Sequence, residues 1–130
     1  EIQAYMKEQQ AHPQFAGYAQ QVGELTQQWL ELTQLIQTQA QQSANEIGAA
    51  SVDYLYFSGY VVFAYLWLKV AVVAQQRVDE GQSDPYYAAK VKTAQFYFER
   101  ILPRTCTHRA NIQAGGASLF LLTPEEFKFD

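Results

Sequence analysis

The feature that most constrains the fold is a long uncharged stretch in the middle of the chain. From Tyr54 to Leu68 the sequence YLYFSGYVVFAYLWL contains no charged residue, and after Lys69 it continues with VAVVA. A helix built from this stretch is apolar in every direction, so other elements have to cover it on several sides. Ser58 and Gly59 form a small spot where another helix can approach closely. We therefore predict a central helix around which the rest of the chain packs.

The same stretch has roughly the length needed to cross a bilayer core of about 30 Å. However, four tyrosines are spread through it instead of being gathered at its ends. Lys69 interrupts it, and no basic cluster flanks it. The sequence therefore favours a buried helix over a membrane span.

Upstream of this stretch, apolar residues recur every three or four positions, which is the period of one face of a helix. The remaining positions are rich in Gln, which suits a solvated helix face. Pro13 disfavours helical backbone at His12, so we expect a long helix over about 14–42, entered after a break. Residues 1–12 are interpreted as a linker, as the end of a preceding helix or as a short helix of their own. The recurring residues are Phe15, Tyr18, Val22, Leu25, Trp29, Leu32 and Ile36.

A third helix is predicted to begin at Asp84 and Pro85, since Asp caps helices and Pro is favoured at the first helical position. Pro103 inside it removes a backbone hydrogen bond, which predicts a kink near residues 99–103. Gly115 and Gly116 are expected to end it. Its apolar residues also recur at threes and fours: Tyr87, Val91, Ala94, Phe98, Ile101, Thr105, His108 and Ile112.

Short connections between long helices favour antiparallel neighbours. We therefore predict an all-α chain, with an antiparallel up-down bundle of three long helices over residues 13–116. A short N-terminal helix precedes the bundle. Residues 117–130, which are apolar and then acidic, are predicted to form a C-terminal strap over the bundle or over whatever the bundle packs on.

Composition and motifs exclude several function classes. A formal net charge of −4 without a basic stripe argues against nucleic-acid binding. A single cysteine, Cys106, excludes an internal disulfide and fits the reducing cytoplasm. The chain has no Gly-rich phosphate loop, CxxC, HExxH or GxSxG, and His12 and His108 have no ligand partner at short spacing. We therefore predict no catalytic, cofactor-binding or metal-binding residue.

Two arginines and a histidine form the candidate anion or partner contact. Between residues 86 and 114 there are five basic residues and a single acid, Glu99. In a regular helix Arg100, Arg104 and His108 lie on one face, which suits a phosphate or a carboxylate. The favoured interpretation is that these cations complement a helix C-terminus and pair with neighbouring acids.

Other polar residues are interpreted as structural. His108 is expected to be a hydrogen-bonded core histidine rather than a proton shuttle. Glu46, Asp53 and Glu99 are expected to be caps or ion-pair partners, with Asp53 near a helix start where its charge suits the dipole. Cys106 lacks a histidine–acid constellation and is expected to be an inert thiol.

The aromatic residues of the central helix form the candidate interface. Two neighbouring helices cover only part of its circumference, so some of Tyr56, Tyr60, Phe63 and Trp67 should remain exposed as a patch larger than monomers usually tolerate. We expect this patch to meet another part of a larger enzyme or a second subunit, and to drive self-association of the isolated chain.

Three segments, taken in order, resemble a known family. YLYFSGYVVFAYLWLKVAVVA, DPYYAAKVKTAQFYFERILPRT and GGASLFLLTPEEF are similar to the extra C-terminal domain of one branch of the acyl-CoA dehydrogenases. The methylthiopropionyl-CoA dehydrogenases are examples of this branch. The resemblance covers about residues 14–128, nearly the whole chain.

The resemblance implies a parent flavoprotein of fatty acid metabolism that uses FAD to remove two hydrogens from the α and β carbons of an acyl-CoA thioester. The flavin and the catalytic glutamate of such enzymes belong to an upstream core, so no functional residue is carried over to this chain. The implied role is packing against that core, shaping the substrate entrance and supporting a cytoplasmic homo-oligomer. A free-standing helical scaffold or interaction module is the alternative.

Overall fold

The computed structural model describes residues 1–128. These residues are 84% helical and contain no strand, which confirms the prediction of an all-α chain. A π-helical turn (η1, Tyr97–Ile101) and a 3₁₀ turn (η2, Leu102–Arg104) separate the last two α-helices. The α-helices are α1 (Ile2–Gln9), α2 (Ala16–Gln42), α3 (Asn45–Asp79), α4 (Pro85–Phe96) and α5 (Thr105–Ala114).

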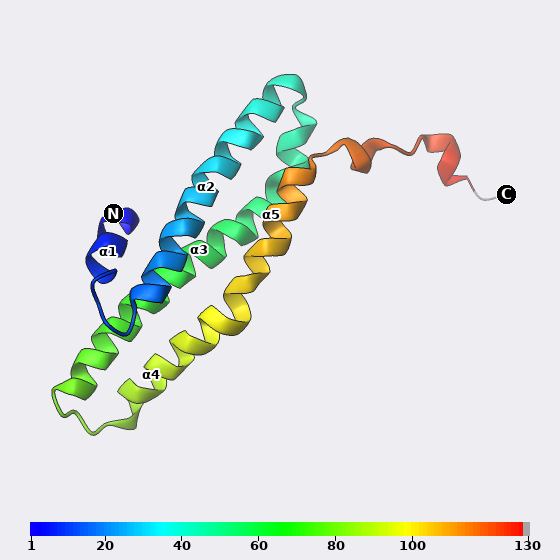
Figure 1. Cartoon of the computed structure of the whole chain (residues 1–130). Coiled ribbons are helices and arrows are strands. Elements are labelled where there is room, and N and C mark those ends of the chain that lie inside the picture. Colours follow the sequence, from blue (N-terminus) through cyan, green and yellow to red (C-terminus); the bar gives the residue numbers. More distant parts are fainter. Residues whose placement is uncertain (129–130) are drawn as a thin grey trace.

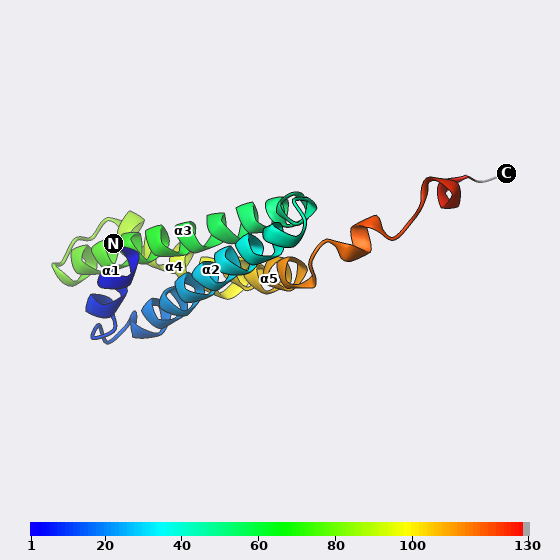
Figure 2. The ribbon, with the colours of Figure 1, turned by 90° about the horizontal axis from the view of Figure 1, so that it is seen from above.

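Helix α3 is the element to which most of the chain attaches. Helix α2 lies along it and α4 and α5 follow each other along it, while the chain reverses direction at 43–44 and at 80–84 (Figure 1). The short α1 packs against α2. Seen from above, α2 and α5 lie on one side of α3, while the start of α4 reaches the other side at the end of α3 (Figure 2). Most of that other side, up to the start of α4, is therefore left without a neighbouring helix.

The ends of the helices follow local signals in the sequence. Helix α2 begins after the turn at Pro13 and ends at Gln42, as predicted. Gly81 follows α3 with a φ of +84°, a left-handed conformation that glycine adopts without strain. Asp84 Oδ1 accepts a hydrogen bond from the backbone N–H of Tyr86 at 2.9 Å, with Pro85 at the first helical position. The predicted start of the third helix is thus confirmed.

The core lies between the inner face of α3 and the helices packed on it. Phe57, Val61, Ala64 and Leu68 are completely buried. Their spacing of three and four residues places them on one side of α3. Every residue of the two predicted apolar stripes, on α2 and on α4–α5, is buried or half-buried. Both stripes therefore face the core, as their period predicted.

The predicted kink at Pro103 is confirmed as a change of helix type. The five residues of η1 widen the helix, and η2 then tightens it around Pro103, which cannot donate a backbone hydrogen bond. The buried Tyr97 in η1 donates its hydroxyl proton to the backbone carbonyl of Tyr60 in α3, at 2.8 Å. Phe98 stacks on Tyr18 of α2 with ring centroids 4.2 Å apart. The π-helical turn η1 therefore contacts both α2 and α3.

The segment after α5, here called the C-terminal arm (117–128), differs from the predicted strap. It leaves the end of α5 and projects away from the helices (Figures 1 and 2). It contains two 3₁₀ turns, η3 (Ala117–Phe120) and η4 (Pro124–Phe127). The prediction that it lies over the bundle itself is wrong, because its apolar residues are exposed. That it covers a partner stays a prediction.

Candidate functional site: the outer face of α3 and the Asp53–His108 pair

The outer side of α3 carries an apolar surface that no other described element covers. From Val52 onward its residues follow the three- and four-residue period of one side of the helix, while Ile47 lies near the start of α3 beside the groove towards α2. The exposed fractions run from 36% for Val62 to 70% for Leu55. We call this surface the outer face of α3: Ile47, Val52, Leu55, Tyr56, Val62, Phe63, Leu66, Val70 and Val73.

The outer face is large for a single domain. With roughly 120 Å² for each fully exposed large side chain, its nine members expose on the order of 600 Å². The largest apolar patch of a typical monomer is about 300–600 Å², and patches of that size mark contact surfaces. By length and composition alone α3 would suffice to cross a bilayer, but 44% of its most apolar stretch is buried within the chain. This arrangement favours a surface for docking over a span.

The four predicted interface residues divide into two pairs. Tyr56 and Phe63 belong to the outer face and are 53% and 56% exposed. Tyr60 and Trp67 are half-buried, and Trp67 lies beside Tyr97 of η1, with ring centroids 6.5 Å apart. The aliphatic members of the face were missed, although their spacing from Phe63 was the signal that marks them. Whether this face binds a partner stays a prediction.

Beside the outer face, Asp53 and His108 join α3 to α5. His108 Nδ1 lies 2.7 Å from Asp53 Oδ1, and Asn111 Nδ2 donates to the same oxygen at 3.1 Å. A carboxylate can only accept, so Nδ1 carries the proton of this hydrogen bond. The imidazole stacks on Tyr56 and Tyr60 at centroid distances of 5.2 and 5.7 Å. His108 is thus hydrogen-bonded, as expected.

The pair resembles the imidazole–carboxylate half of a catalytic triad, but the described residues do not complete one. A triad needs a nucleophile within hydrogen-bond reach of the second imidazole nitrogen, and no serine, threonine or cysteine hydrogen bond to His108 occurs among residues 1–128. Asp53 was expected to be a cap or an ion-pair partner near the start of α3. It lies beyond the second turn, so it caps no helix end, and it lies within ion-pair distance of His108 of α5. The arrangement is a structural link between two helices.

Arg100 and Arg104 do not have the regular spacing from which the anion site was predicted. Both side chains are exposed. The chain between them passes from η1 to η2, so the four-residue spacing of an α-helix does not apply there. Neither forms an ion pair among the described residues, and His108 is already bonded to a carboxylate. Anion binding by this set stays a prediction.

The other polar candidates lie apart from one another. Glu46, in the first turn of α3, accepts the backbone N–H of Gly116 at 2.8 Å, whereas Glu99 accepts from Gln95 on an exposed surface. Cys106 is an exposed free thiol. No group of three His, Cys, Asp or Glu side chains that could hold a metal ion is found within residues 1–128.

The left-handed glycines of the described residues are not placed to hold the pyrophosphate of FAD. A pyrophosphate is held by backbone N–H groups at a helix N-terminus, where the dipole is positive and a glycine lets the backbone approach. Here the two glycines with positive φ, Gly81 and Gly115, follow the C-termini of α3 and α5, where the dipole is negative. These two glycines therefore do not form a dinucleotide cradle.

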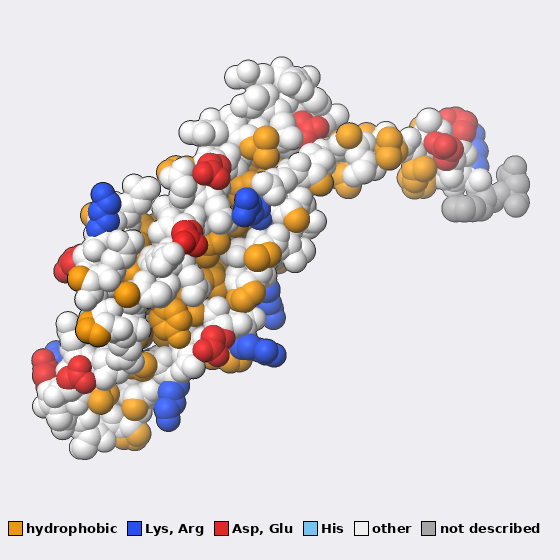
Figure 3. Space-filling model, in the orientation of Figure 1, with side chains coloured by type: hydrophobic (Ala, Val, Ile, Leu, Met, Phe, Trp, Pro, Cys, Tyr) orange, Lys and Arg blue, Asp and Glu red, His pale blue; other side chains and the backbone are white. Residues whose placement is uncertain are grey.

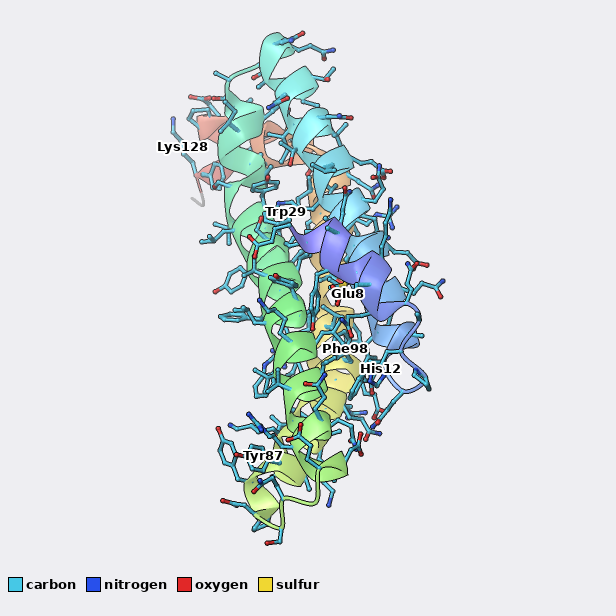
Figure 4. The ribbon with its side chains drawn as sticks, turned by 90° about the vertical axis from the view of Figure 1, so that its left-hand side faces the viewer. Glu8, His12, Trp29, Tyr87, Phe98 and Lys128 are labelled. Carbon is cyan, nitrogen blue, oxygen red and sulfur yellow. The ribbon has the colours of Figure 1, made fainter. Side chains whose placement is uncertain are left out.

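Between α2 and α3 lies an apolar groove of about 680 Å³ that is lined by Ile36, Ile47, Tyr54 and Leu55 among others, with no charged side chain. Tyr54 and Thr33 form a hydrogen bond of 2.7 Å across it. Trp29, labelled in Figure 4, lies one turn away on α2, and its indole N–H is buried without a partner. The polar groups that line this groove are hydroxyl and amide groups.

On the face shown in Figure 3, hydrophobic side chains gather between α2 and α4–α5, with charged side chains around them and more hydrophobic ones on the arm. Together these observations describe an all-helical chain with a large uncovered apolar surface on α3. A family model described as acetyl-CoA dehydrogenase C-terminal like matches residues 1–123, and the chain belongs to this family. The match includes α1. Neither a curated protein nor a solved structure matches the chain.

Proposed function

We propose that this chain is the C-terminal accessory domain of an FAD-dependent, cytoplasmic acyl-CoA dehydrogenase of the methylthiopropionyl-CoA dehydrogenase-like branch. The parent oxidises the CH–CH bond of an acyl-CoA thioester with the FAD held in its own catalytic core. The domain supplies no catalytic residue and acts by packing and oligomerisation. Membership of the acetyl-CoA dehydrogenase C-terminal family over residues 1–123 supports this proposal.

The observation that carries the packing role is the outer face of α3. Leaving this face in water forfeits the free energy that burial of its apolar side chains would gain, at about 25 cal/mol per Å². An assembled enzyme recovers that free energy if the face contacts the catalytic core or another subunit. Gly59 lies within the face, and no side chain or backbone of another element lies within 4 Å of the position of its missing Cβ. A partner helix can approach closely at this point.

The test replaces an outer-face aromatic with a charge. Phe63→Glu places a carboxylate in the middle of the face, while Phe96→Glu makes the same change on α4 at an identical exposure of 56%. Sedimentation velocity at tens of micromolar should show self-association of the wild-type chain and of Phe96→Glu, and monomers for Phe63→Glu. Tyr60 is a poorer choice, because it is half-buried and stacks on His108.

A wild-type chain that sediments as a monomer, or a Phe63→Glu variant that associates as wild type does, would show that the face is not an interface in this chain. Circular dichroism of both variants serves as the folding control. The full open reading frame distinguishes the accessory domain from the alternative, a free-standing scaffold or interaction module. A flavoprotein core encoded directly upstream supports the accessory domain. An unrelated upstream sequence contradicts it.

A further inference from the structure

The C-terminal arm presents apolar side chains to water just as the outer face does. Five of its residues have exposed fractions between 58% and 72%: Leu119, Phe120, Leu121, Leu122 and Phe127. Apart from the Gly116–Glu46 hydrogen bond at its base, no side-chain hydrogen bond or ion pair within residues 1–128 joins it to the helices. Exposed apolar side chains in this number are typical of a segment that binds another surface.

The end of the arm is ordered before it meets any partner. Thr123 and Glu126 form a capping box, in which Glu126 Oε2 accepts from the Thr123 backbone N–H at 2.7 Å and from its hydroxyl at 3.0 Å. The hydrogen bond from the Thr123 backbone lowers the pKa of Glu126 below its ordinary value, which keeps this carboxylate charged. A turn already formed in the free chain costs less conformational entropy when it binds.

At the other end of the molecule, α3 and α4 enclose an apolar groove of about 310 Å³. Its floor contains Val70 and Val73 of the outer face, and its rim carries Lys69 and Lys90. Lys90 Nζ lies 4.9 Å from the centroid of the Tyr86 ring. Neither lysine has a carboxylate within ion-pair distance among the described residues. The groove therefore suits an apolar side chain with a carboxylate near it.

The arm offers an apolar side chain preceded by two acids, since Phe127 follows Glu125 and Glu126. Lys128 follows Phe127 and lies 3.8 Å from Glu125 on an exposed surface, so docking in the groove exchanges this pair for one between Glu125 and a lysine of the groove. The arm cannot reach the groove of its own chain. From Pro85 to Ala114 the α4–α5 segment spans about 45 Å. From Ala114 to Phe127, eight residues in 3₁₀ turns and five extended ones reach roughly 33 Å. The arm can therefore fill only the α3–α4 groove of a second copy of the chain.

A twofold axis indicates how the arm of each copy can reach the α3–α4 groove of the other copy. Figure 4 shows Tyr87, which lines the groove, and Lys128 of the arm on the same side of α3 and at its opposite ends. If two copies meet through their outer faces with the α3 helices antiparallel, each arm comes to the groove end of the other copy. A twofold arrangement of this kind buries the same surface on both subunits and closes, so it produces a dimer and not a filament.

We propose that two copies of this chain form an antiparallel dimer in which the C-terminal arm of each copy docks in the α3–α4 groove of the other. Phe127 enters between Val70 and Val73, and Glu125 pairs with Lys90. This inference rests on the proposed function, whose docking surface it assigns to a second copy. Outer face and arm together expose on the order of 1,000 Å² per copy, compared with about 800 Å² per partner in a stable interface.

Disulfide trapping between two different variants tests the exchange. In a Cys106→Ser background, one protein carries Phe127→Cys and the other, enlarged by an N-terminal tag, carries Val73→Cys. The full 130-residue chains are mixed and mildly oxidised, and mixed disulfides are measured on a denaturing gel. The control replaces Val73→Cys with Val52→Cys, an exposed site at the opposite end of the same face. We expect the Val73 pair to give about tenfold more mixed disulfide, because docking raises the local thiol concentration.

Equal yields for the two pairs, or a disulfide that forms only within a doubly substituted single chain, would overturn arm exchange. Sedimentation of Phe63→Glu separates this failure from that of the proposed function. If Phe63→Glu dissociates the chain but no mixed disulfide forms, the outer face is an interface and the arm is not part of it. If Phe63→Glu leaves the association unchanged, the proposed packing role fails as well. Circular dichroism of each cysteine variant verifies that the bundle is intact.

Discussion

His108 Nδ1 in α5 lies 2.7 Å from Asp53 Oδ1 in α3, and this hydrogen bond joins residues that are 55 positions apart in the sequence. Asn111 donates to the same carboxylate oxygen. Three side chains from two helices thus hold the end of α5 against α3 beside the outer face. The pair is partly accessible, with side-chain exposures of 20% for His108 and 23% for Asp53.

Asp53→Ala should lower the free energy of unfolding by about 1–2 kcal/mol, because it removes the acceptor of a partly buried hydrogen bond and of an exposed one. Urea denaturation at pH 7 measures the change. Glu24→Ala is the matched control, since Glu24 accepts from Gln20 on an exposed surface and its loss should stay within about 0.5 kcal/mol. A double-mutant cycle with His108→Gln should give a coupling energy above zero. Strict additivity would refute the link.

We expect the free energy of unfolding to fall at alkaline pH because of Tyr97. Burial, followed by the proximity of Tyr60, raises the pKa of the Tyr97 hydroxyl well above its ordinary value of 10.0. Above pH 10 the unfolded chain therefore releases this proton while the folded chain keeps it, and the free energy of unfolding falls as the pH rises. Burial acts in the same direction on Tyr5 and Tyr18.

Tyr97→Phe should cost about 1 kcal/mol at pH 7, where the hydrogen bond to the Tyr60 carbonyl is lost. The same variant should show a shallower decline of stability between pH 10 and pH 11, because one of the tyrosines that couple folding to pH is gone. Urea midpoints across this range provide the measurement. A decline as steep as that of the wild type would assign the alkaline sensitivity to other groups.

Two glycines should respond oppositely to alanine. Gly59 is inside α3 and its added Cβ would meet nothing within 4 Å, so Gly59→Ala should raise the free energy of unfolding by about 0.5–1 kcal/mol. Gly115, at φ +71° and ψ −177°, has a backbone conformation that is essentially restricted to glycine, so Gly115→Ala should cost about 1–3 kcal/mol. Thermal and urea unfolding measure both.

Gly59→Ala also tests the packing role. If a second helix approaches the outer face closely, the added methyl group should weaken self-association while it stabilises the fold. Sedimentation equilibrium beside urea unfolding separates the two effects. Stabilisation together with unchanged association would mean that the partner does not come close at Gly59.

The purified chain should bind no FAD and oxidise no acyl-CoA, since its left-handed glycines follow helix C-termini and no described element cradles a pyrophosphate. Absorbance near the flavin band after gel filtration and acyl-CoA-dependent dye reduction are the measurements. A yellow protein with flavin retained at near-equal stoichiometry would contradict this expectation.

The helices could be predicted from sequence because their limits are local. Pro13, the Asp84–Pro85 cap and Gly115 each act on the backbone within a few residues, and the structure places helix ends beside all of them. The buried faces of the helices were predictable for the same reason, because apolar residues at a period of three and four mark one face of a helix regardless of what packs on it.

The candidate site was less predictable, because it depends on how helices are rotated against each other. Nothing in the sequence pairs Asp53 with His108, which become neighbours only when α3 and α5 pack. The spacing of Arg100 and Arg104 assumed a regular helix, and the change of helix type at η1 and η2 invalidates it. The composition of the arm indicated that its apolar side chains bind another surface, but it carried no information on which surface that is.

The attachment of the C-terminal arm has a consequence for how this protein can diverge. Among the described residues no side-chain hydrogen bond or ion pair joins the arm to the helices, and only Gly116, the residue before it, is held by Glu46. Substitutions in the arm share almost no contacts with the core, so their effects on folding free energy add independently to those of core substitutions. Selection can therefore alter the arm, and with it the choice of partner, while the helices retain their stability. The two parts are free to evolve at different rates.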